Sequence, residues 1–205
     1  MPSLRIAILG AGKVGGTLGR HWARAGHTVA FGVRNPTSEK AQGLLAEPGD
    51  RVTIGSIAEA LPDSDVILLA VPGAVVDEII TTYANLLDHK IIIDAANKMQ
   101  TTPANSVATL QAHAPNALIY RAFNSYGWEN FADPIYQGTP ADLFYSGPDG
   151  IPQAQVEQLI SEVGLHPVRL GGVDQADLVD GILRLWFTIA TAQKNRNIAL
   201  KVLAR

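Results

Sequence analysis

Glycine residues at a fixed spacing near the amino terminus point to the binding of a dinucleotide. A short apolar run ends in Gly10-Ala11-Gly12-Lys13-Val14-Gly15, and a helical pattern follows at once over residues 14–25. In such a turn the first glycine permits a tight bend, the second lets the backbone approach a pyrophosphate, and the third lets the helix pack closely on its strand. The first N–H groups of the helix then face the phosphates. Between a strand and a helix this spacing favours dinucleotide binding over the alternative, a similar turn with an altered site.

The end of the second predicted strand indicates which dinucleotide is bound. NAD-binding proteins usually place an acidic side chain about 20 residues after the glycine turn, where it accepts hydrogen bonds from the ribose 2′-hydroxyl. Here no carboxylate comes before Glu39. The side chains of this loop that can donate hydrogen bonds are Arg34, Asn35, Thr37, Ser38 and Lys40. Because a 2′-phosphate favours a guanidinium group and other donors, the loop predicts NADP(H). A solvated loop that caps a helix is the alternative.

Loops after later strands supply the remaining candidates for the site. In an open α/β sheet, ligands bind outside the carboxyl ends of the strands, near the switch in strand order. Small or polar residues at these ends are predicted to surround the ribose and the nicotinamide ring: Ala70, Val71, Pro72, Ala95, Asn97, Ala122 and Asn124. Pro72 could instead serve only to end its strand. Phe123, Tyr126 and Trp128 fit core or lid positions better than stacking platforms.

The chain shows no pattern typical of covalent or metal catalysis. Its five histidines are scattered without the spacing of metal ligands, it has no G-x-S-x-G turn, and it has no cysteine. We therefore predict no catalytic side chain and no metal site. Hydride transfer from a bound NADPH to a planar acceptor would need neither, because the protein would only have to hold the donor and acceptor atoms about 3–3.5 Å apart.

Composition bounds the class of protein. The chain has 205 residues, of which 47% are hydrophobic and 17% charged, and its net charge is −3. These values are typical of a compact globular protein and give no electrostatic reason to expect nucleic acid or an anionic membrane as partner. No apolar run approaches the ~20 residues that span a bilayer, and the amino terminus reads as a strand rather than a secretory signal. A cytoplasmic protein is expected.

The elements that must position these residues alternate regularly along the chain. Strands are predicted over 6–9, 27–33, 52–54, 65–71, 90–94, 117–122, 143–146 and 166–170. Helices are predicted over 14–25, 38–45, 57–61, 74–87, 102–112, 128–131 and 152–163. This alternation predicts an α/β fold with a doubly wound, mainly parallel sheet.

The carboxyl-terminal stretch has a different pattern. From residue 174 to 203 no strand is evident, and apolar residues recur at helical spacing: Leu178, Ile182, Leu185, Trp186 and Ile189. We predict a Rossmann domain over 1–172 and a carboxyl-terminal helical extension over 173–205. The extension could cover the sheet and form a homodimer surface, or Trp186 and its neighbours could line a pocket for a planar second substrate.

Several of these segments together resemble one known family. The segments are 10–15, Gly32-Val33-Arg34, Ala70-Val71-Pro72, Asp94-Ala95-Ala96-Asn97, Ala122-Phe123-Asn124 with Glu129-Asn130, and the ending at 198–203. They resemble the coenzyme F420-dependent NADP oxidoreductase family, whose members bind NADP(H) on a Rossmann domain. The resemblance implies that Gly10 to Val14 hold the pyrophosphate, that Arg34 binds the 2′-phosphate, and that Val71, Pro72 and Ala122 line the nicotinamide side. Lys98 stands where many relatives have proline, so this loop is expected to differ.

The resemblance implies reversible hydride transfer between NADPH and the deazaflavin coenzyme F420, or a flavin such as FMN or FAD in related domains. Two alternatives remain open. One is an NADPH-dependent reductase of a small carbonyl or imine, which needs a proton donor near the ring. Tyr126 and Lys98 are the candidates for that donor. The other is a non-catalytic NADP(H)-binding sensor.

Overall fold

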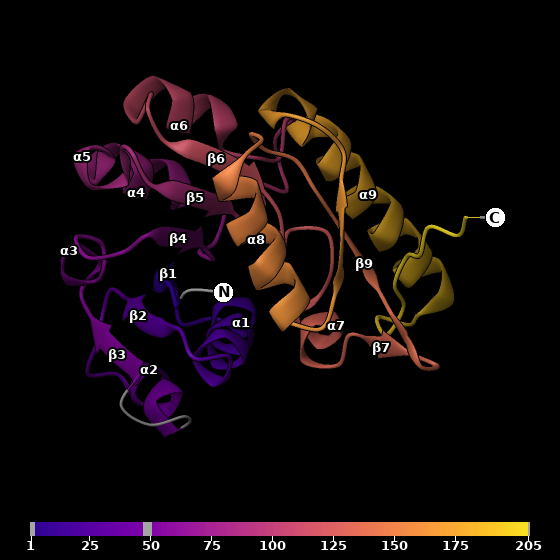
Figure 1. The fold of residues 1–205 in the computed structure, drawn as a ribbon, viewed down its shortest axis with the longest axis horizontal. Helices are drawn as coiled ribbons and strands as arrows, with labels where there is room; N and C mark the ends of the chain where they lie inside the picture. Colours follow the sequence, from indigo (N-terminus) through magenta and orange to yellow (C-terminus); the bar gives the residue numbers. More distant parts are fainter. Residues whose placement is uncertain (1–2, 47–50, 205) are drawn as a thin grey trace.

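The computed structural model describes residues 3–46 and 51–204. Six parallel strands form the main sheet in the order β3-β2-β1-β4-β5-β6 (Figure 1). They are β1 (Arg5–Leu9), β2 (Thr28–Gly32), β3 (Val52–Gly55), β4 (Val66–Leu69), β5 (Ile91–Asp94) and β6 (Leu118–Arg121). The order reverses between β1 and β4, which is the topological switch point where doubly wound sheets bind ligands.

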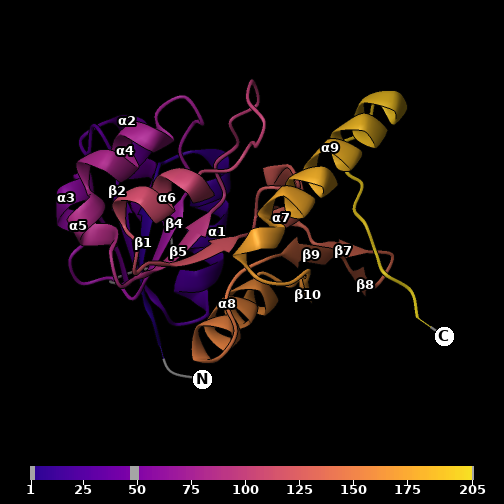
Figure 2. The ribbon, with the colours of Figure 1, turned by 90° about the horizontal axis from the view of Figure 1, so that it is seen from above.

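Helices cover both faces of this sheet. The helices of the first part of the chain are α1 (Lys13–Arg24), α2 (Glu39–Gln42), the 3₁₀ helix η1 (Gly43–Ala46), α3 (Ile57–Ala60), α4 (Val76–Thr82), α5 (Ala84–Leu87) and α6 (Val107–His113). They are followed by α7 (Trp128–Ala132) and α8 (Ile151–Glu162). Figure 2 shows α1 and α8 on one side of the strands, with α4 and α6 on the other.

Two hydrophobic cores result, one on each face. Ile8 and Leu68 point into the core beneath α1 and α8, whereas Leu9 and Ile67 point into the core beneath α3, α4 and α6. Strands buried on both faces need nearly continuous apolar sequences, which explains the unbroken runs read from the sequence. The prediction of a doubly wound, parallel α/β fold is confirmed.

Beyond β6 the chain adds a smaller layer. Strands β9 (Asp142–Tyr145) and β10 (His166–Arg169) pair in parallel, and Arg121 and Ser146 exchange backbone hydrogen bonds that join β9 to the edge of β6. The hairpin of β7 (Ile135–Tyr136) with β8 (Thr139–Pro140) was not predicted, because strands of two residues carry no periodic signal.

The carboxyl-terminal part is one long helix followed by an extended tail. A 3₁₀ turn, η3 (Val173–Gln175), leads into α9 (Ala176–Gln193), which ends where Lys194 adopts a left-handed conformation with φ 50°. The predicted helical pattern is therefore wrong beyond residue 193. The tail lies beside β9, where the N–H of Asp142 donates to Leu200 O and its carboxylate accepts from Lys201 Nζ at 2.6 Å. The boundary between the two predicted domains stays a prediction.

The side of α9 that is buried also differs in part from the expected one. Trp186 is 1% exposed, but Leu178 and Leu185 are 52% and 47% exposed. The buried side is formed by Ala176, Val179, Asp180, Leu183, Trp186 and Ala190. A charged residue on this side was not expected from the apolar pattern, and its partners are described below.

Three further helices differ from their predicted limits. The helix expected over 38–45 is α2 followed by the 3₁₀ helix η1. The helix expected over 74–87 is divided into α4 and α5 at Tyr83. The helix expected over 102–112 begins only at Val107. The N–H groups of Ala104 and Ser106 donate to the carboxylates of Asp180 and Asp94, so the segment before α6 follows these side chains instead of a helical path. Within residues 3–46 and 51–204, no helix combines the length and apolar character needed to cross a membrane.

Candidate functional site

The glycine turn lies at the switch point of the sheet, against the end of β4. Gly10 has φ +114°, and a Cβ atom there would lie 2.5 Å from Ala70 O. A Cβ at Gly15 would lie 2.6 Å from Gly10 O, so α1 packs directly on the turn. Gly12 is different, because a Cβ there would meet no atom of the described residues within 4 Å. The space beside Gly12 is thus open, as the approach of a pyrophosphate requires.

The amino terminus of α1 is suited to bind an anion at this point. Gly12 is the N-cap, no side chain caps the helix, and its first turn has no acidic residue. The first N–H groups of a helix have no partner within it, so those of Lys13 and Val14 are available to phosphate oxygens. The predicted pyrophosphate residues therefore form one continuous surface around the turn.

The loop after β2 presents an exposed guanidinium group. Arg34 is exposed and, within the described residues, its side chain makes no hydrogen bond or ion pair. Its neighbours are internally bonded: Asn35 Oδ1 accepts from Thr37 N and Thr37 Oγ1, and Ser38 Oγ caps α2 by accepting from Ala41 N. The helix cap proposed as an alternative for this loop is present, and it leaves Arg34 free. Lys40 lies in α2, but its side chain is outside the described part of the structure.

The ends of β4 and β5 meet on the other side of the turn. Val71 Cγ1 lies 3.3 Å from the Cβ position of Gly10, and a Cβ at Gly73 would lie 2.2 Å from Asn97 O. Ala95 donates its N–H to Leu69 O, which keeps the two strand ends in register. Ala70, Val71 and Asn97 are half-buried, Pro72 is exposed and Ala95 is buried. The structure thus brings the predicted residues of these two loops into contact.

The predicted residues after β6 lie deeper. Ala122 is fully buried, and Asn124 is buried with its Nδ2 donating to Asp180 at 3.3 Å. Phe123 between them has φ 58°, which is unusual for a residue other than glycine. Its ring packs edge-on against Trp22 and Phe131, each with a centroid distance of 5.7 Å. Phe123 is therefore a core residue that fixes this turn, and Asn124 acts through its buried contacts.

A groove of about 610 Å³ is lined by residues of the glycine turn, α1, the α2–η1 segment and α7. Lys13, Arg20, Leu44 and Trp128 are among its lining residues, and Lys13 Nζ lies 4.6 Å from the centroid of the Trp128 ring. Among the described residues that line it, none comes from the loops after β4 or β5. The groove therefore lies on the side of the turn that faces α2 and α7.

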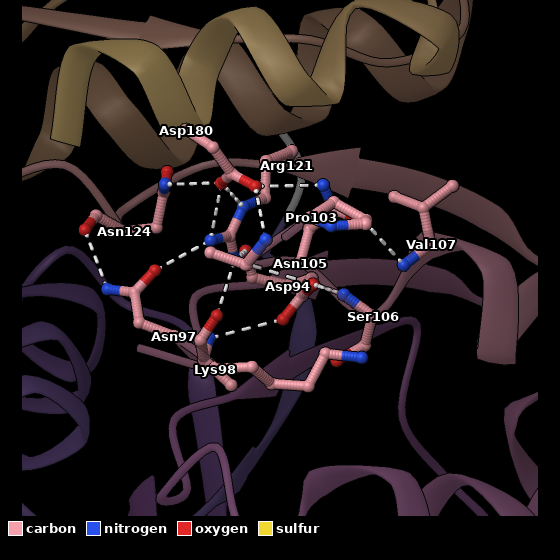
Figure 3. Close-up of polar contacts among 12 residues, drawn as sticks. Asp94, Asn97, Lys98, Pro103, Asn105, Ser106, Val107, Arg121, Asn124 and Asp180 are labelled. Carbon is pink, nitrogen blue, oxygen red and sulfur yellow. Dashed lines mark hydrogen bonds and ion pairs between the residues drawn. The ribbon is translucent and has the colours of Figure 1, made fainter. Parts of the chain in front are cut away.

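A buried ionic cluster under the loops after β5 and β6 was missed by the sequence analysis. Arg121, Asp94 and Asp180 are all 0% exposed. Figure 3 shows their polar contacts. Arg121 Nε donates to Asp180 Oδ1 at 2.8 Å, and Nη1 donates to the carbonyl oxygens of Asp94 and Ala96 at 3.0 and 2.6 Å. Its Nη2 donates to Asn97 Oδ1 at 2.6 Å. The opposite charges of Asp94 and Arg121 at the ends of two adjacent strands could have indicated an ion pair from the sequence. Nothing in the sequence indicated that Asp180 would join it.

The cluster holds two carboxylates against one guanidinium group. Burial raises the pKa of Asp94 above its ordinary value, while Arg121 and the N–H groups of Ser106 and Ala96 act in the opposite direction. Asp180 is satisfied by Arg121, Asn124, Ala104 and Asn105. Because removing one partner would leave a buried charge unpaired, the cluster ties α9 firmly to the carboxyl end of the sheet.

Neither candidate proton donor is free at the site. Lys98 Nζ forms an ion pair with Asp77 at 3.2 Å. Tyr126 is buried, and its hydroxyl donates to Asp142 O at 2.7 Å and accepts from Leu200 N at 3.2 Å. Burial raises the pKa of Tyr126 above its ordinary value. Trp186 is likewise committed to the core, because its Nε1 donates to Ile198 O at 2.8 Å.

The fold and the glycine turn define a Rossmann-type dinucleotide-binding protein. Residues 5–98 match the model of the family described as NADP oxidoreductase, coenzyme F420-dependent. The family prediction is thereby confirmed over these residues, together with the oxidoreductase class and the NADP(H) cofactor that the description names.

Other known proteins are similar over the fold. A candidate F420-dependent NADP reductase from Arthrobacter sp. FB24 superimposes with a TM-score of 0.84 at 24% identity, covering 98% of this chain and 100% of that one. A reductive aminase from Aspergillus terreus in complex with NADPH and ethyl levulinate has a TM-score of 0.68 at 21% identity, covering 94% and 63%.

In sequence, the chain is 29% identical over 109 residues to the glycerol-3-phosphate dehydrogenase [NAD(P)+] of Streptococcus equi subsp. zooepidemicus. That match covers 48% of this chain and 32% of the dehydrogenase, so the chain spans about a third of the length of this curated relative.

The open space at Gly12 generates a test of the glycine turn. Gly12→Ala introduces a methyl group where the pyrophosphate must approach, so NADPH affinity should fall by at least about tenfold, or ~1.4 kcal/mol. The melting temperature should change by less than ~2 °C, because the new Cβ has no neighbour within 4 Å. Titration of NADPH fluorescence and a thermal melt measure the two effects.

The matched variant is Gly10→Ala, in which the added Cβ collides with Ala70 O and the backbone keeps a positive φ. It should destabilise the fold by ~1–3 kcal/mol and lower the melting temperature by at least ~2–4 °C. If Gly12→Ala bound NADPH as well as the wild type, the turn would not hold the pyrophosphate.

Proposed function

We propose that the protein transfers a hydride between NADP(H) and a deazaflavin such as coenzyme F420, or a flavin such as FMN or FAD. The observation that carries the proposal is the pairing of an open glycine turn at the switch point with the unpaired Arg34 at the end of β2. Bound NADPH supplies the hydride, and the planar acceptor takes it. The protein's residues bind, orient and shield the two rings.

The strand order supports placing the two halves of the dinucleotide on opposite sides of β1. Arg34 follows β2, on one side of β1, and suits the 2′-phosphate. With the pyrophosphate at the amino terminus of α1, the nicotinamide half extends over the ends of β4 and β5 on the other side. Val71, Pro72 and Asn97 would then border the ring, with Ala95 and Ala122 beneath it.

The engagement of both candidate proton donors in other contacts favours a deazaflavin or flavin acceptor. Reduction of a carbonyl or imine needs an acid near the ring, and both candidates, Lys98 and Tyr126, are engaged elsewhere. Hydride transfer to a ring that draws its proton from solvent needs only proximity and orientation. These contacts therefore support a deazaflavin or flavin as acceptor more than a small carbonyl or imine.

Arg34→Ala tests the cofactor assignment. Loss of the guanidinium group should weaken NADPH binding by ~1.5–3 kcal/mol, because a charge-assisted contact to the 2′-phosphate is removed. NADH lacks this phosphate, and its affinity should change far less. Calorimetric titration with both nucleotides measures the difference, with Arg184→Ala on the exposed side of α9 as control. Equal losses for both nucleotides would remove Arg34 from the phosphate site.

The acceptor is tested by following NADPH oxidation with coenzyme F420, FMN, FAD and riboflavin in turn, with NADH as the control donor. We expect turnover with the deazaflavin or with a flavin, and little with NADH. No oxidation with any of the four, although NADPH binds, would contradict the hydride-transfer proposal and favour a small substrate or a sensing role.

We also propose a homodimer formed through α9, in the cytoplasm. Leu178 and Leu185 are exposed, and Ile182 and Ile189 on the same side of the helix are half-buried. Light scattering should give twice the mass of one chain, and Leu185→Glu should give the monomer while the exposed-site control Ile151→Glu does not. A monomeric wild type would contradict the dimer.

A further inference from the structure

Asp180 lies on α9, which comes after β10 in the sequence. Through its hydrogen-bond partners it is nevertheless connected to the edge of the sheet where the proposed function places the nicotinamide half. Through Arg121 it reaches Asn97 Oδ1 and the carbonyl oxygens of Asp94 and Ala96. Figure 3 shows the guanidinium group between α9 and this segment. Apart from Asp180, the residues that Arg121 binds are the last residue of β5 and two residues of the stretch that immediately follows it.

Asp180 reaches the same edge by two further routes. Its Oδ1 accepts from Asn124 Nδ2, and Asn97 Nδ2 donates to Asn124 O at 2.9 Å, which closes a ring of contacts. Its Oδ2 accepts from Ala104 N at 3.1 Å, and Ala104 O accepts from Lys98 N at 2.8 Å. Both ends of the segment from Asp94 to Lys98 are thus held by groups that Asp180 orients.

The held segment has little freedom to move on its other side. Asn97 O is so close to Gly73 that no Cβ could be accommodated there. A displacement of Asn97 would therefore change its contact with the loop after β4, whose residues Val71 and Pro72 are proposed to border the ring. The glycine turn packs against Ala70 and Val71 at the end of β4, but within the described residues neither the turn nor Arg34 makes a hydrogen bond with Asp180, Arg121 or Asn97.

We infer that Asp180 is a positioning residue for the nicotinamide half of the cofactor, acting through Arg121 and Asn97, and that it has no influence on the phosphate half. The inference rests on the proposed function. It predicts that a substitution of Asp180 weakens the binding of the nicotinamide half only, although Asp180 contacts neither half directly.

The test compares two ligands that share the phosphates and differ in the ring: NADPH and 2′-phospho-ADP-ribose, which lacks nicotinamide. In Asp180→Asn, NADPH affinity should fall at least tenfold, while the affinity for 2′-phospho-ADP-ribose should stay within about twofold of the wild type. The fluorescence lifetime of bound NADPH should move toward that of the free nucleotide. No hydride acceptor is needed for these readouts.

Asp177→Asn is the matched control. Asp177 is exposed, lies one turn earlier on α9 and accepts from the same Asn105, but makes no contact with Arg121. This variant should bind both ligands as the wild type does. Equal weakening of both ligands in Asp180→Asn, or no weakening of either, would overturn the inference.

Because Asp180→Asn alters a buried ionic cluster and could fail to fold, a second measurement uses the wild type alone. NADPH, compared with 2′-phospho-ADP-ribose, should slow amide hydrogen exchange both in residues 94–98 and in residues 176–183. Protection of the first segment without the second would overturn the coupling to α9. A wild type that binds neither ligand would instead overturn the proposed function, and the inference with it.

Discussion

The close approach of the glycine turn to the end of β4 is the constraint on which the site depends. Gly10 lies against Ala70 O, and Gly15 lies against Gly10 O, so side chains at either position would force α1 away from the sheet. With both glycines in place, the amino terminus of α1 is fixed over the switch point between β1 and β4. The parallel register then aligns the ends of β2, β4 and β5 around this point. An anion bound at the amino terminus of α1 would consequently lie at the same edge of the sheet as Arg34 and Asn97.

A second constraint is electrostatic and comes from the buried cluster of Asp94, Arg121 and Asp180. Two buried carboxylates and one buried guanidinium group could not persist without complete hydrogen bonding, since isolated buried charges are strongly unfavourable. Arg121 meets this demand by donating to carbonyl groups of the loop after β5 and to Asp180 on α9. The carboxyl-terminal helix is thus joined to the edge of the sheet by charge and hydrogen bonds as well as by apolar packing. The tail beyond it is fixed in the same manner at Asp142, where bonds from Lys201, Val202 N and His166 outweigh the effect of burial and hold the pKa of the carboxyl below its ordinary value.

Much of this arrangement could be predicted from the sequence because its signals are local. Apolar runs and the glycine spacing predicted the strands, the switch point and the turn, and the missing acid before Glu39 drew attention to Arg34. Contacts between distant residues had no such signal: Arg121 and Asp180 are brought together only by the fold, and they also decide that α6 begins at Val107. The side of α9 that faces the protein was misjudged for the same reason, since Leu178 and Leu185 are as apolar as the buried residues and differ only in position.

The central claim is that the dinucleotide crosses the switch point with its phosphates on α1, its 2′-phosphate at Arg34 and its nicotinamide ring over the loops after β4 and β5. A crystal structure of the protein with NADP⁺ bound tests this most directly. We predict pyrophosphate oxygens within hydrogen-bond distance of the N–H groups of Lys13 and Val14, and the nicotinamide ring beside Val71 and Asn97. A nucleotide seated instead in the groove between Arg20, Leu44 and Trp128, with the glycine turn empty, would contradict the account.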